Sequence, residues 1–332
     1  MNKDKRKLVV IALGGNAIKQ AHEKGTAEEQ FKNVATTCDQ LVKMNALGYK
    51  LIITHGNGPQ AGNLLIQQEE AKNLVPPQPL DVVGAMTQGQ IGYMFQNILR
   101  DYFINKGKDI PITTVVTQVL VDENDPDFDD PSKPVGPFYT EEVALELQDT
   151  KGYVVKQVKP TGKKTWRRVV PSPEPKIIVE ADCIKALVAA RAIIIASGGG
   201  GVPVKMNPDG TFSGLEAVID KDKAGNVLAQ AVDADIFLIL TDVQNAYVNY
   251  GKPDEKALGE ITVEEAEKYL AEGHFLAGSM GPKMQAAIRF VKAGGDKSII
   301  TSLDHAVDAL EGKTGTRIKE YPITNKEYPM TK

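Results

Sequence analysis

The chain alternates between short apolar runs and longer segments in which apolar residues recur every three or four positions. A short apolar run bounded by turn residues is typical of a strand buried on both faces, and the longer period is typical of an amphipathic helix. The pattern predicts strands at 8–13, 49–54, 111–121, 192–197, 236–240 and 297–301, and helices at 28–47, 60–71, 80–105, 218–232, 262–272 and from 278. Strand, helix and strand in this order form parallel βαβ units, so the sequence predicts an α/β fold with a mainly parallel open sheet.

Residues 122–175 depart from this alternation. The segment opens with an acidic run broken by prolines at 125–131, and two alternating runs at 153–159 and 165–170 flank a turn that contains proline and glycine. Two such runs around a short turn predict a β-hairpin. Long insertions in compact enzymes usually serve function. We therefore interpret 122–175 as a small protruding α+β subdomain with the role of a lid, inserted within a single domain of 1–332.

Composition is that of an ordinary globular enzyme, with 25% charged residues and a net charge of −4. The sequence has no stripe of basic residues of the kind that indicates nucleic-acid binding. No apolar run approaches the ~20 residues that a membrane span requires. With no signal peptide recognisable, we expect a cytoplasmic protein. Cys38 and Cys183 are lone thiols that we expect to be small buried residues. The four histidines lack ligand spacing, so the sequence predicts no metal site built from them.

Two glycine-containing turns follow the first two predicted strands, Gly14-Gly15-Asn16 and Gly56-Asn57-Gly58. Glycine allows close backbone approach, and amide N–H groups that point into one concavity bind phosphate or carboxylate. One such turn is equally well explained as a tight strand-to-helix connection. Two more turns follow later strands, at 198–201 and at Thr241-Asp242. Because the carboxyl ends of parallel strands lie at one edge of a sheet, four turns favour a shared ligand site.

Neither of the common nucleotide-binding motifs accounts for these turns. Residues 56–61 fit the dinucleotide pattern G-x-G-x-x-A, but no acidic residue stands at the tip of the next strand, because Asp81 follows a proline cluster at the head of a helix. The P-loop pattern is absent from the sequence. A phosphate site in this protein is therefore built differently.

Three lysines supply the charge that such a site needs. Lys133 lies among prolines and glycine at 131–137, Lys221 follows Asp220, and Lys283 follows Gly281 and Pro282. A single lysine is usually a solvated surface charge, but rigid backbone beside the lysine favours a fixed cation. Phosphoryl transfer depends on fixed cations, because charge spreads over the oxygens of the transferring group.

Six segments carry a resemblance that covers residues 8–317. They read ALGGNA at 12–17, THGNGPQ at 54–60, PSKPVGP at 131–137, RRVVPSP at 167–173, AVIDKD at 217–222 and AGSMGPKM at 277–284. Together they are similar to the carbamate kinases of the amino acid kinase superfamily. The first turn is shared across the superfamily, whereas the segments around Lys133 and at 167–173 are more particular to carbamate kinases.

The resemblance implies a three-layer α/β/α sandwich and a homodimer. It also implies reversible phosphoryl transfer between ATP and carbamate, which gives ADP and carbamoyl phosphate, with Mg²⁺ bound together with the nucleotide. In this scheme Gly14, Gly15 and Asn16 cradle the transferring phosphoryl group. The second turn, Gly56, Asn57 and Gly58, holds the carbamate or carbamoyl end.

The same resemblance assigns roles to the charged residues. Lys133 approaches the substrate phosphate from the inserted subdomain, and Asp220 orients the lysines. Lys221 and Lys283 bind nucleotide phosphates and stabilise the transition state. The nucleotide is bordered by Thr241, Asp242 and Tyr247. Gln244 departs from the acidic residue expected in this family, which affects the rim of the nucleotide site and not the reaction.

Three other functions are considered. A superfamily kinase could phosphorylate another small carboxylate or phosphate, the chain could be a metabolite-binding regulator without catalysis, or it could be a dinucleotide dehydrogenase. Retention of all three lysines argues against a regulator. The expected use is ATP formation from carbamoyl phosphate, as in arginine metabolism, although the sequence does not fix the direction.

Overall fold

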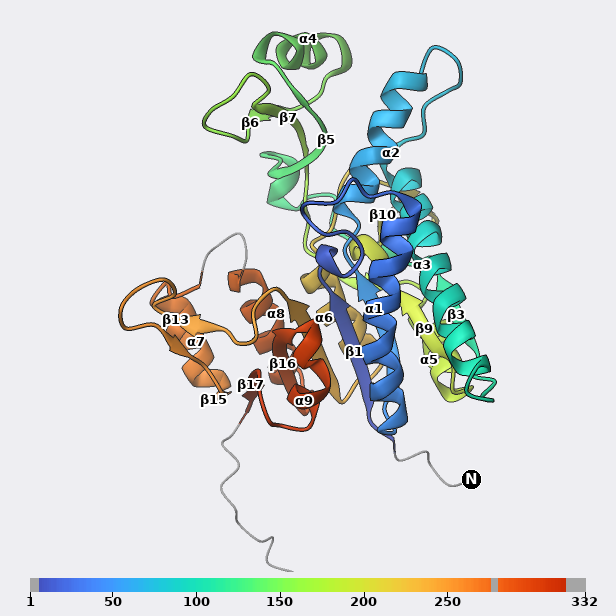
Figure 1. Ribbon diagram of the computed structural model, residues 1–332. Coiled ribbons are helices and arrows are strands. Elements are labelled where there is room, and N and C mark those ends of the chain that lie inside the picture. The colour runs from blue at the N-terminus through green and yellow to red at the C-terminus, as the bar shows by residue number, and fades with distance from the viewer. Residues whose placement is uncertain (1–5, 276–279, 321–332) are drawn as a thin grey trace, which may run out of the picture.

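The computed structural model describes residues 6–275 and 280–320, and its main sheet has the strand order β15-β17-β16-β12-β1-β2-β9-β3 (Figure 1). The parallel strands are β1 (Leu8–Leu13), β2 (Lys50–His55), β3 (Ile112–Val115), β9 (Ile193–Ala196), β12 (Ile236–Thr241) and β16 (Lys297–Ser302). At one edge, β17 (Thr316–Lys319) runs antiparallel to β16 and pairs in parallel with β15 (Glu260–Thr262). The predicted mainly parallel sheet is confirmed.

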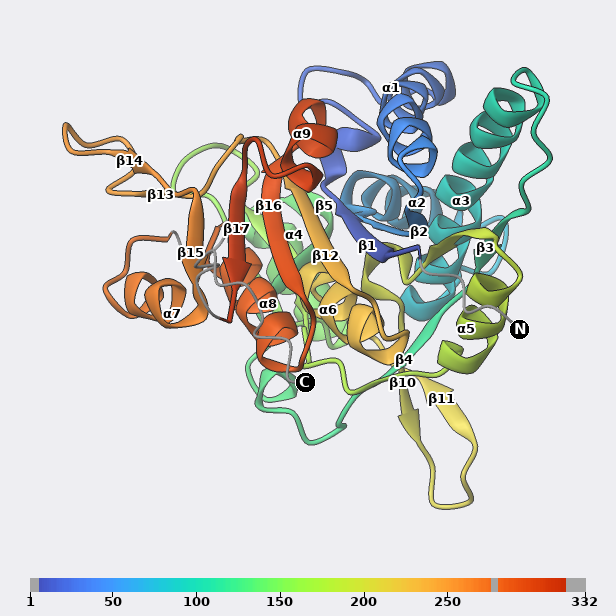
Figure 2. The same ribbon diagram turned by 90° about the horizontal axis from the view of Figure 1, so that it is seen from below.

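Helices cover both faces of this sheet (Figure 2). One face carries α1 (Ala27–Ala46), α3 (Leu80–Ile104) and α9 (Ala306–Leu310), and the other carries α5 (Ala181–Ala189), α6 (Lys221–Ala231), α7 (Val263–Ala271) and α8 (Met280–Lys292). All six residues of β1 are buried, because Val9 and Ile11 pack into one core while Val10 and Ala12 pack into the other. Burial on both faces is the reason for the unbroken apolar runs, and the three-layer sandwich is confirmed.

A second sheet of four strands adjoins the main one. Its order is β11 (Phe212–Gly214), β10 (Val202–Met206), β4 (Gln118–Leu120) and β8 (Ile177–Ile178). The single strand predicted at 111–121 is therefore wrong, because the chain passes from β3 to β4 and changes sheets. Thr117 lies at this change, where its backbone N–H donates to Gln88 Oε1 (2.9 Å) and its carbonyl accepts from Gln88 Nε2 (3.1 Å).

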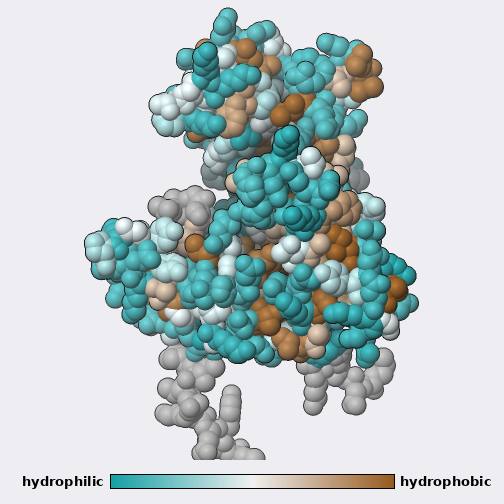
Figure 3. Space-filling view, in the orientation of Figure 1, coloured by the Kyte–Doolittle hydropathy of each residue, from teal (hydrophilic) through white to brown (hydrophobic). Residues whose placement is uncertain are grey.

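The chain leaves the second sheet after β4 and returns in β8, its antiparallel neighbour. Between them lie β5 (Lys133–Tyr139), α4 (Glu141–Lys151), β6 (Val155–Gln157) and β7 (Trp166–Val170). The β6–β7 pairing is antiparallel and confirms the predicted hairpin. These elements protrude above the main body in the ribbon and space-filling views (Figures 1 and 3).

The remaining predicted elements lie within a few residues of the observed ones. The other elements are α2 (Gly58–Ala71), β13 (Tyr247–Val248), β14 (Lys256–Ala257) and the 3₁₀ turns at Gly15–Ala17, Pro126–Phe128, Gly198–Gly200 and Leu303–His305. The strand at 297–301 is not the last, because β17 follows it. The predicted helix from 278 begins outside the described residues, and α8 is described from Met280. Cys38 is buried as expected, whereas Cys183 is exposed on the outer side of α5.

Within residues 6–275 and 280–320, no helix is long and apolar enough to cross a membrane.

Candidate active site

A cavity of about 370 Å³ lies where β1 and β2 end. Gly15 lines it from the turn after β1, and Gly56, Asn57 and Gly58 line it from the turn after β2. The two turns are adjacent, since a Cβ placed on Gly56 would lie 3.5 Å from the backbone nitrogen of Gly15. Gly14 and Asn16 do not line this cavity. A Cβ on Gly14 would instead lie 3.3 Å from the carbonyl oxygen of Leu240.

The side chain of Asn57 is fixed from two sides. Its Nδ2 donates to Thr87 Oγ1 (2.9 Å), and Thr87 is fully buried in α3. On the other side, Gly199 has a φ of +68°, and a Cβ there would lie 2.2 Å from Asn57 Nδ2. Gly199 is therefore required both by its backbone conformation and by the space that Asn57 occupies. Gly199, in the turn at 198–201, thus leaves room for Asn57, in the turn at 56–58.

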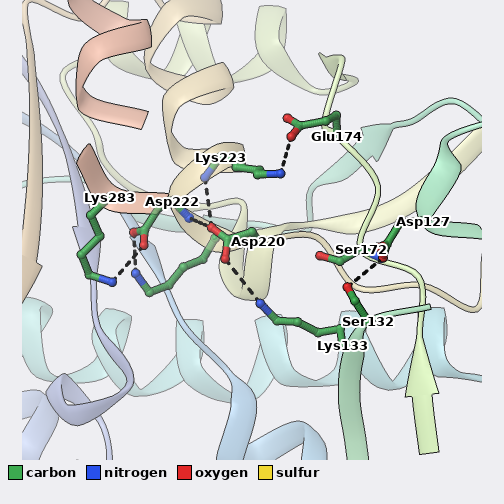
Figure 4. Close-up of polar contacts among 10 residues, drawn as sticks. Asp127, Ser132, Lys133, Ser172, Glu174, Asp220, Asp222, Lys223 and Lys283 are labelled. Atoms are coloured by element: carbon green, nitrogen blue, oxygen red, sulfur yellow. Dashed lines mark hydrogen bonds and ion pairs between the residues drawn. The ribbon is translucent and has the colours of Figure 1, made fainter. Parts of the chain in front are cut away.

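Two of the three predicted lysines meet at one buried carboxylate. Lys221 is the first residue of α6, and Lys283 lies in the first turn of α8. Asp222 is 3% exposed, and its carboxylate accepts from Lys221 Nζ (2.5 Å) and Lys283 Nζ (3.2 Å) (Figure 4). The carboxylate that these two ammonium groups contact is that of Asp222, and the role of Asp220 in orienting the lysines stays a prediction. Asp222 is the last residue of the segment AVIDKD at 217–222, and the sequence alone assigns it no function.

Asp220 instead contacts the third lysine. As the N-cap of α6, its Oδ1 accepts from the backbone N–H groups of Asp222 and Lys223, and its Oδ2 lies 3.4 Å from Lys133 Nζ (Figure 4). Burial by itself raises the pKa of Asp220, but the Lys133 ammonium and these N–H groups outweigh burial and lower it. Asp220 is therefore ionised near neutral pH.

The charges at this site favour an anion. Three ammonium groups face two carboxylates, which leaves the cavity with a net positive charge. The side chain of Lys133 is 45% exposed, against 18% for Lys221 and 15% for Lys283. The two helix-borne lysines are thus held rigidly, whereas Lys133 reaches in from β5 with more freedom.

Arg167 is a cavity residue to which the sequence argument gave no role. It lies on β7, and its Nη2 donates to the carbonyl oxygen of Gly136 (2.7 Å). Its Nε is buried without a hydrogen-bond partner in the described part of the chain, and burial lowers the pKa of the guanidinium. Arg168 pairs instead with Glu216. Because successive residues of a strand face opposite sides, the alternation of 167 and 168 was the signal that could have separated the two arginines.

A second pocket, of about 260 Å³, lies beyond the end of β12. It is lined by Thr241, Asp242, Val243, Tyr247, Tyr250, His274, Phe275 and Met280. The structure thus brings together the three residues predicted to border a nucleotide, Thr241, Asp242 and Tyr247. The Tyr247 and Tyr250 rings lie 5.7 Å apart between centroids and give the pocket an aromatic wall.

The two pockets are joined by short connections. Asn16 Nδ2 donates to Asp242 Oδ1 (2.7 Å), so the turn after β1 touches the second pocket while Gly15 lines the first. On α8, Met280 lines the second pocket and Lys283 lines the first. The two pockets therefore lie close to each other. Gln244 does not line the second pocket, and its Nε2 donates to Thr314 Oγ1 (2.6 Å).

Comparison with known proteins places this geometry in a family. The chain matches the model of the Amino acid kinase family over residues 7–302. The carbamate kinase of Thermococcus kodakarensis is 56% identical over 315 residues, which cover 94% of this chain and 99% of that protein. The chain belongs to the carbamate kinases. Within the same family, the carbamate kinase of Clostridium perfringens is 45% identical over 314 residues, covering 93% of this chain and 99% of the other.

A solved carbamate kinase structure also shares the fold. The enzyme from Giardia lamblia bound to AMP-PNP aligns with a TM-score of 0.91 at 47% identity, covering 95% of this chain and 99% of that chain. The alignment therefore extends over nearly the whole of both chains.

Proposed function

We propose that the two pockets together catalyse reversible phosphoryl transfer between ATP and carbamate, giving ADP and carbamoyl phosphate. The observation that carries this proposal is the convergence of Lys133, Lys221 and Lys283, from three separate elements, on one cavity beside two glycine turns. Two anions must approach each other in this reaction, so fixed positive charge is the main requirement. The acceptor oxygen of carbamate already carries negative charge and needs no strong general base.

The nucleotide is proposed to lie across both pockets. Its base fits the aromatic pocket bordered by Thr241, Asp242 and Tyr247, and its phosphates extend past the start of α8 toward Lys221 and Lys283. The link between Asn16 and Asp242 supports this path, because it places the first turn beside the junction of the pockets. In this arrangement the turn formed by Gly14, Gly15 and Asn16 cradles the transferring phosphoryl group, with Gly15 as the member that lines the catalytic cavity.

The carbamate is proposed to bind at the opposite end of the first cavity. Gly56, Asn57 and Gly58 present backbone and a fixed side-chain amide to its planar group. Lys133 contacts the substrate phosphate from the subdomain, which acts as the lid of a single-domain enzyme. Arg167 supports this assignment, because a half-buried guanidinium with an unpartnered Nε is suited to a carboxylate or phosphate oxygen.

Mg²⁺ is proposed to arrive as part of the nucleotide substrate. The described residues contain no group of three or more His, Cys, Asp or Glu side chains that could hold a metal ion. Asp220 and Asp222, the carboxylates of the cavity, are both bound to lysines. The carboxylates of the cavity therefore do not fit a Mg²⁺ ion held by protein ligands alone.

The homodimer is proposed to form through an exposed apolar face of α3. Val82, Met86 and Tyr93 are exposed and share one side of this helix, while its opposite side packs into the core. A second copy of the chain would cover this face, and light scattering of the purified protein tests it. The cytoplasmic location and the place in arginine metabolism remain predictions.

A coupled assay tests the proposed reaction. The purified chain is given ADP, Mg²⁺ and carbamoyl phosphate, and ATP formation is followed. We expect ATP to form only with the divalent cation present, and the Lys283→Ala variant purified in the same way serves as the control for contaminating kinases. Much faster reaction with acetyl phosphate, or with glutamate or aspartate as acceptor in the reverse direction, would favour another member of the superfamily.

A further inference from the structure

A third cavity, of about 280 Å³, lies on the side of α2 that faces away from the catalytic cavity. The catalytic cavity contacts Gly58, Ala61, Gly62 and Leu65 of this helix, whereas the third cavity contacts Gln60, Asn63, Leu64 and Gln67. These two sets lie on opposite sides of a helix with 3.6 residues per turn. Lys19 and Gly25, from the chain between β1 and α1, Gln30 of α1 and Gln90 of α3 also line the third cavity, and Pro59 of α2 lines both cavities. None of these residues has a role in the proposed reaction.

The wall of the third cavity contains a pair of buried amides. Gln30 is 5% exposed and Gln60 is 3% exposed. Gln30 Nε2 donates to the carbonyl oxygen of Gly25 (2.8 Å), which fixes the orientation of its amide, and its Oε1 accepts from Gln60 Nε2 (2.8 Å). Gln60 Oε1 is left as an acceptor with no partner in the described part of the chain. This oxygen belongs to a residue that lines the cavity, so a ligand there can supply the hydrogen-bond donor that the protein does not.

A cation lies in the same cavity. Lys19 forms no ion pair among residues 6–275 and 280–320, and its Nζ donates only to the carbonyl oxygen of Gln20 (3.3 Å). Its alkyl chain lies against Gly25, since a Cβ on Gly25 would lie 2.8 Å from Lys19 Cε. The remaining donors of this ammonium are suited to a carboxylate.

We propose that this cavity binds a free α-amino acid with a polar side chain. The ammonium group of the ligand donates to Gln60 Oε1, and its carboxylate accepts from Lys19. Asn63, Gln67 and Gln90 offer amide donors and acceptors to the side chain, and none of the three makes a side-chain hydrogen bond within the described residues. The site does not depend on the proposed reaction, because it lies on the other side of α2 from the lysines of the catalytic cavity and shares only Pro59 with that cavity among the described residues.

Thermal unfolding of the full chain tests the proposal. The protein is unfolded in the presence of each standard amino acid in turn, and any ligand found is titrated by calorimetry. We expect at least one polar amino acid to raise Tm by about 2 °C or more at saturation. The Lys19→Ala and Asn63→Ala variants are expected to weaken its affinity by about tenfold or more, since each loses a direct contact. The matched control is Lys32→Ala, which removes an exposed lysine of α1 outside the cavity and is expected to bind as the unaltered chain does.

Three results would overturn the proposal. The first is that no standard amino acid changes Tm. The second is that a ligand is found but binds equally well to Lys19→Ala and Asn63→Ala. The third is competition by saturating ADP and carbamoyl phosphate, which would place the amino acid in the catalytic cavity instead.

Discussion

Replacement of Lys283 by alanine tests whether the lysines of the cavity stabilise the transition state. Lys283 and Lys221 both donate to Asp222, so removing one of them leaves this buried carboxylate with the other as a partner. Loss of one partner therefore does not strand an uncompensated charge, and we expect Lys283→Ala to fold. The reciprocal variant, Lys221→Ala, leaves Asp222 bound to Lys283 and follows the same reasoning.

The expected loss of activity follows from the position of the charge. The Lys283 side chain is only 15% exposed, so its charge acts in a medium of lower polarity than water. A unit charge about 4 Å from another contributes ~4 kcal/mol at an effective dielectric constant of ~20. This energy corresponds to a rate change of roughly 10³-fold. We therefore expect kcat/KM to fall by roughly 10²–10⁴-fold in either variant, as with other preorganised electrostatic groups.

The assay is ATP formation from ADP and carbamoyl phosphate, with Tm measured on the same preparations. Lys292→Ala is the matched control, because Lys292 ends the same helix and pairs at the surface with Glu267. We expect this control to retain its activity. A folded Lys283→Ala variant that loses less than about tenfold in kcat/KM would refute the reasoning and return Lys283 to the status of a structural partner of Asp222.

The remaining predictions concern the lid and one buried histidine. Arg167→Lys is expected to raise KM for carbamoyl phosphate by roughly 10-fold or more through loss of the planar fork, with Arg168→Lys as the control that should leave this KM nearly unchanged. Burial lowers the pKa of His55 to about 4. The His55 imidazole therefore stays neutral in the folded chain, whereas in the unfolded chain it takes up a proton below about pH 6.5. Stability should then be full above pH 6.5 and fall by about 1.4 kcal/mol per pH unit below it, and urea unfolding of His55→Gln should lack this part of the slope between pH 6.5 and 5. Lys133→Ala should weaken carbamoyl phosphate binding and leave ADP affinity nearly unchanged, and hydrogen exchange at 122–175 should slow when both ligands bind; equal loss of both affinities would contradict the lid role.

The sequence predicted the layers of the fold well because buried strands have an unmistakable composition. Every position of β1 faces one of two cores, so no polar residue interrupts the run. The same argument fails for β17, whose residues Thr316–Lys319 alternate in burial over only four positions at an edge of the sheet. It fails again at 111–121, where one run rich in β-branched residues passes between two sheets and the change is marked by long-range hydrogen bonds such as those of Thr117 with Gln88.

The members of the site were predicted better than their contacts. Glycine and lysine at strand and helix ends are local signals, so the two turns and three lysines could be found from the sequence. Which carboxylate binds which lysine depends on how α6 and α8 pack, because Asp222 points between their first turns and Asp220, two residues earlier, points toward β5. No periodicity within one element contains that information. For Arg167 the alternation along β7 separates it from Arg168, but that it faces the cavity follows only from the placement of the subdomain over the sheet.

The contact between Lys133 and Asp220 has a further consequence for closure of the subdomain. The ammonium is half-exposed and lies 3.4 Å from the carboxylate, a geometry in which an ion pair contributes about 1 kcal/mol or less. A substrate phosphate carries more charge than Asp220 and offers several oxygens to the same ammonium, so it can take over Lys133 at little cost. Asp220 keeps its backbone N–H donors from α6 when this happens and remains satisfied. In the proposed lid role, the pair would hold Lys133 close to the substrate site of the free enzyme without opposing its transfer to the substrate phosphate.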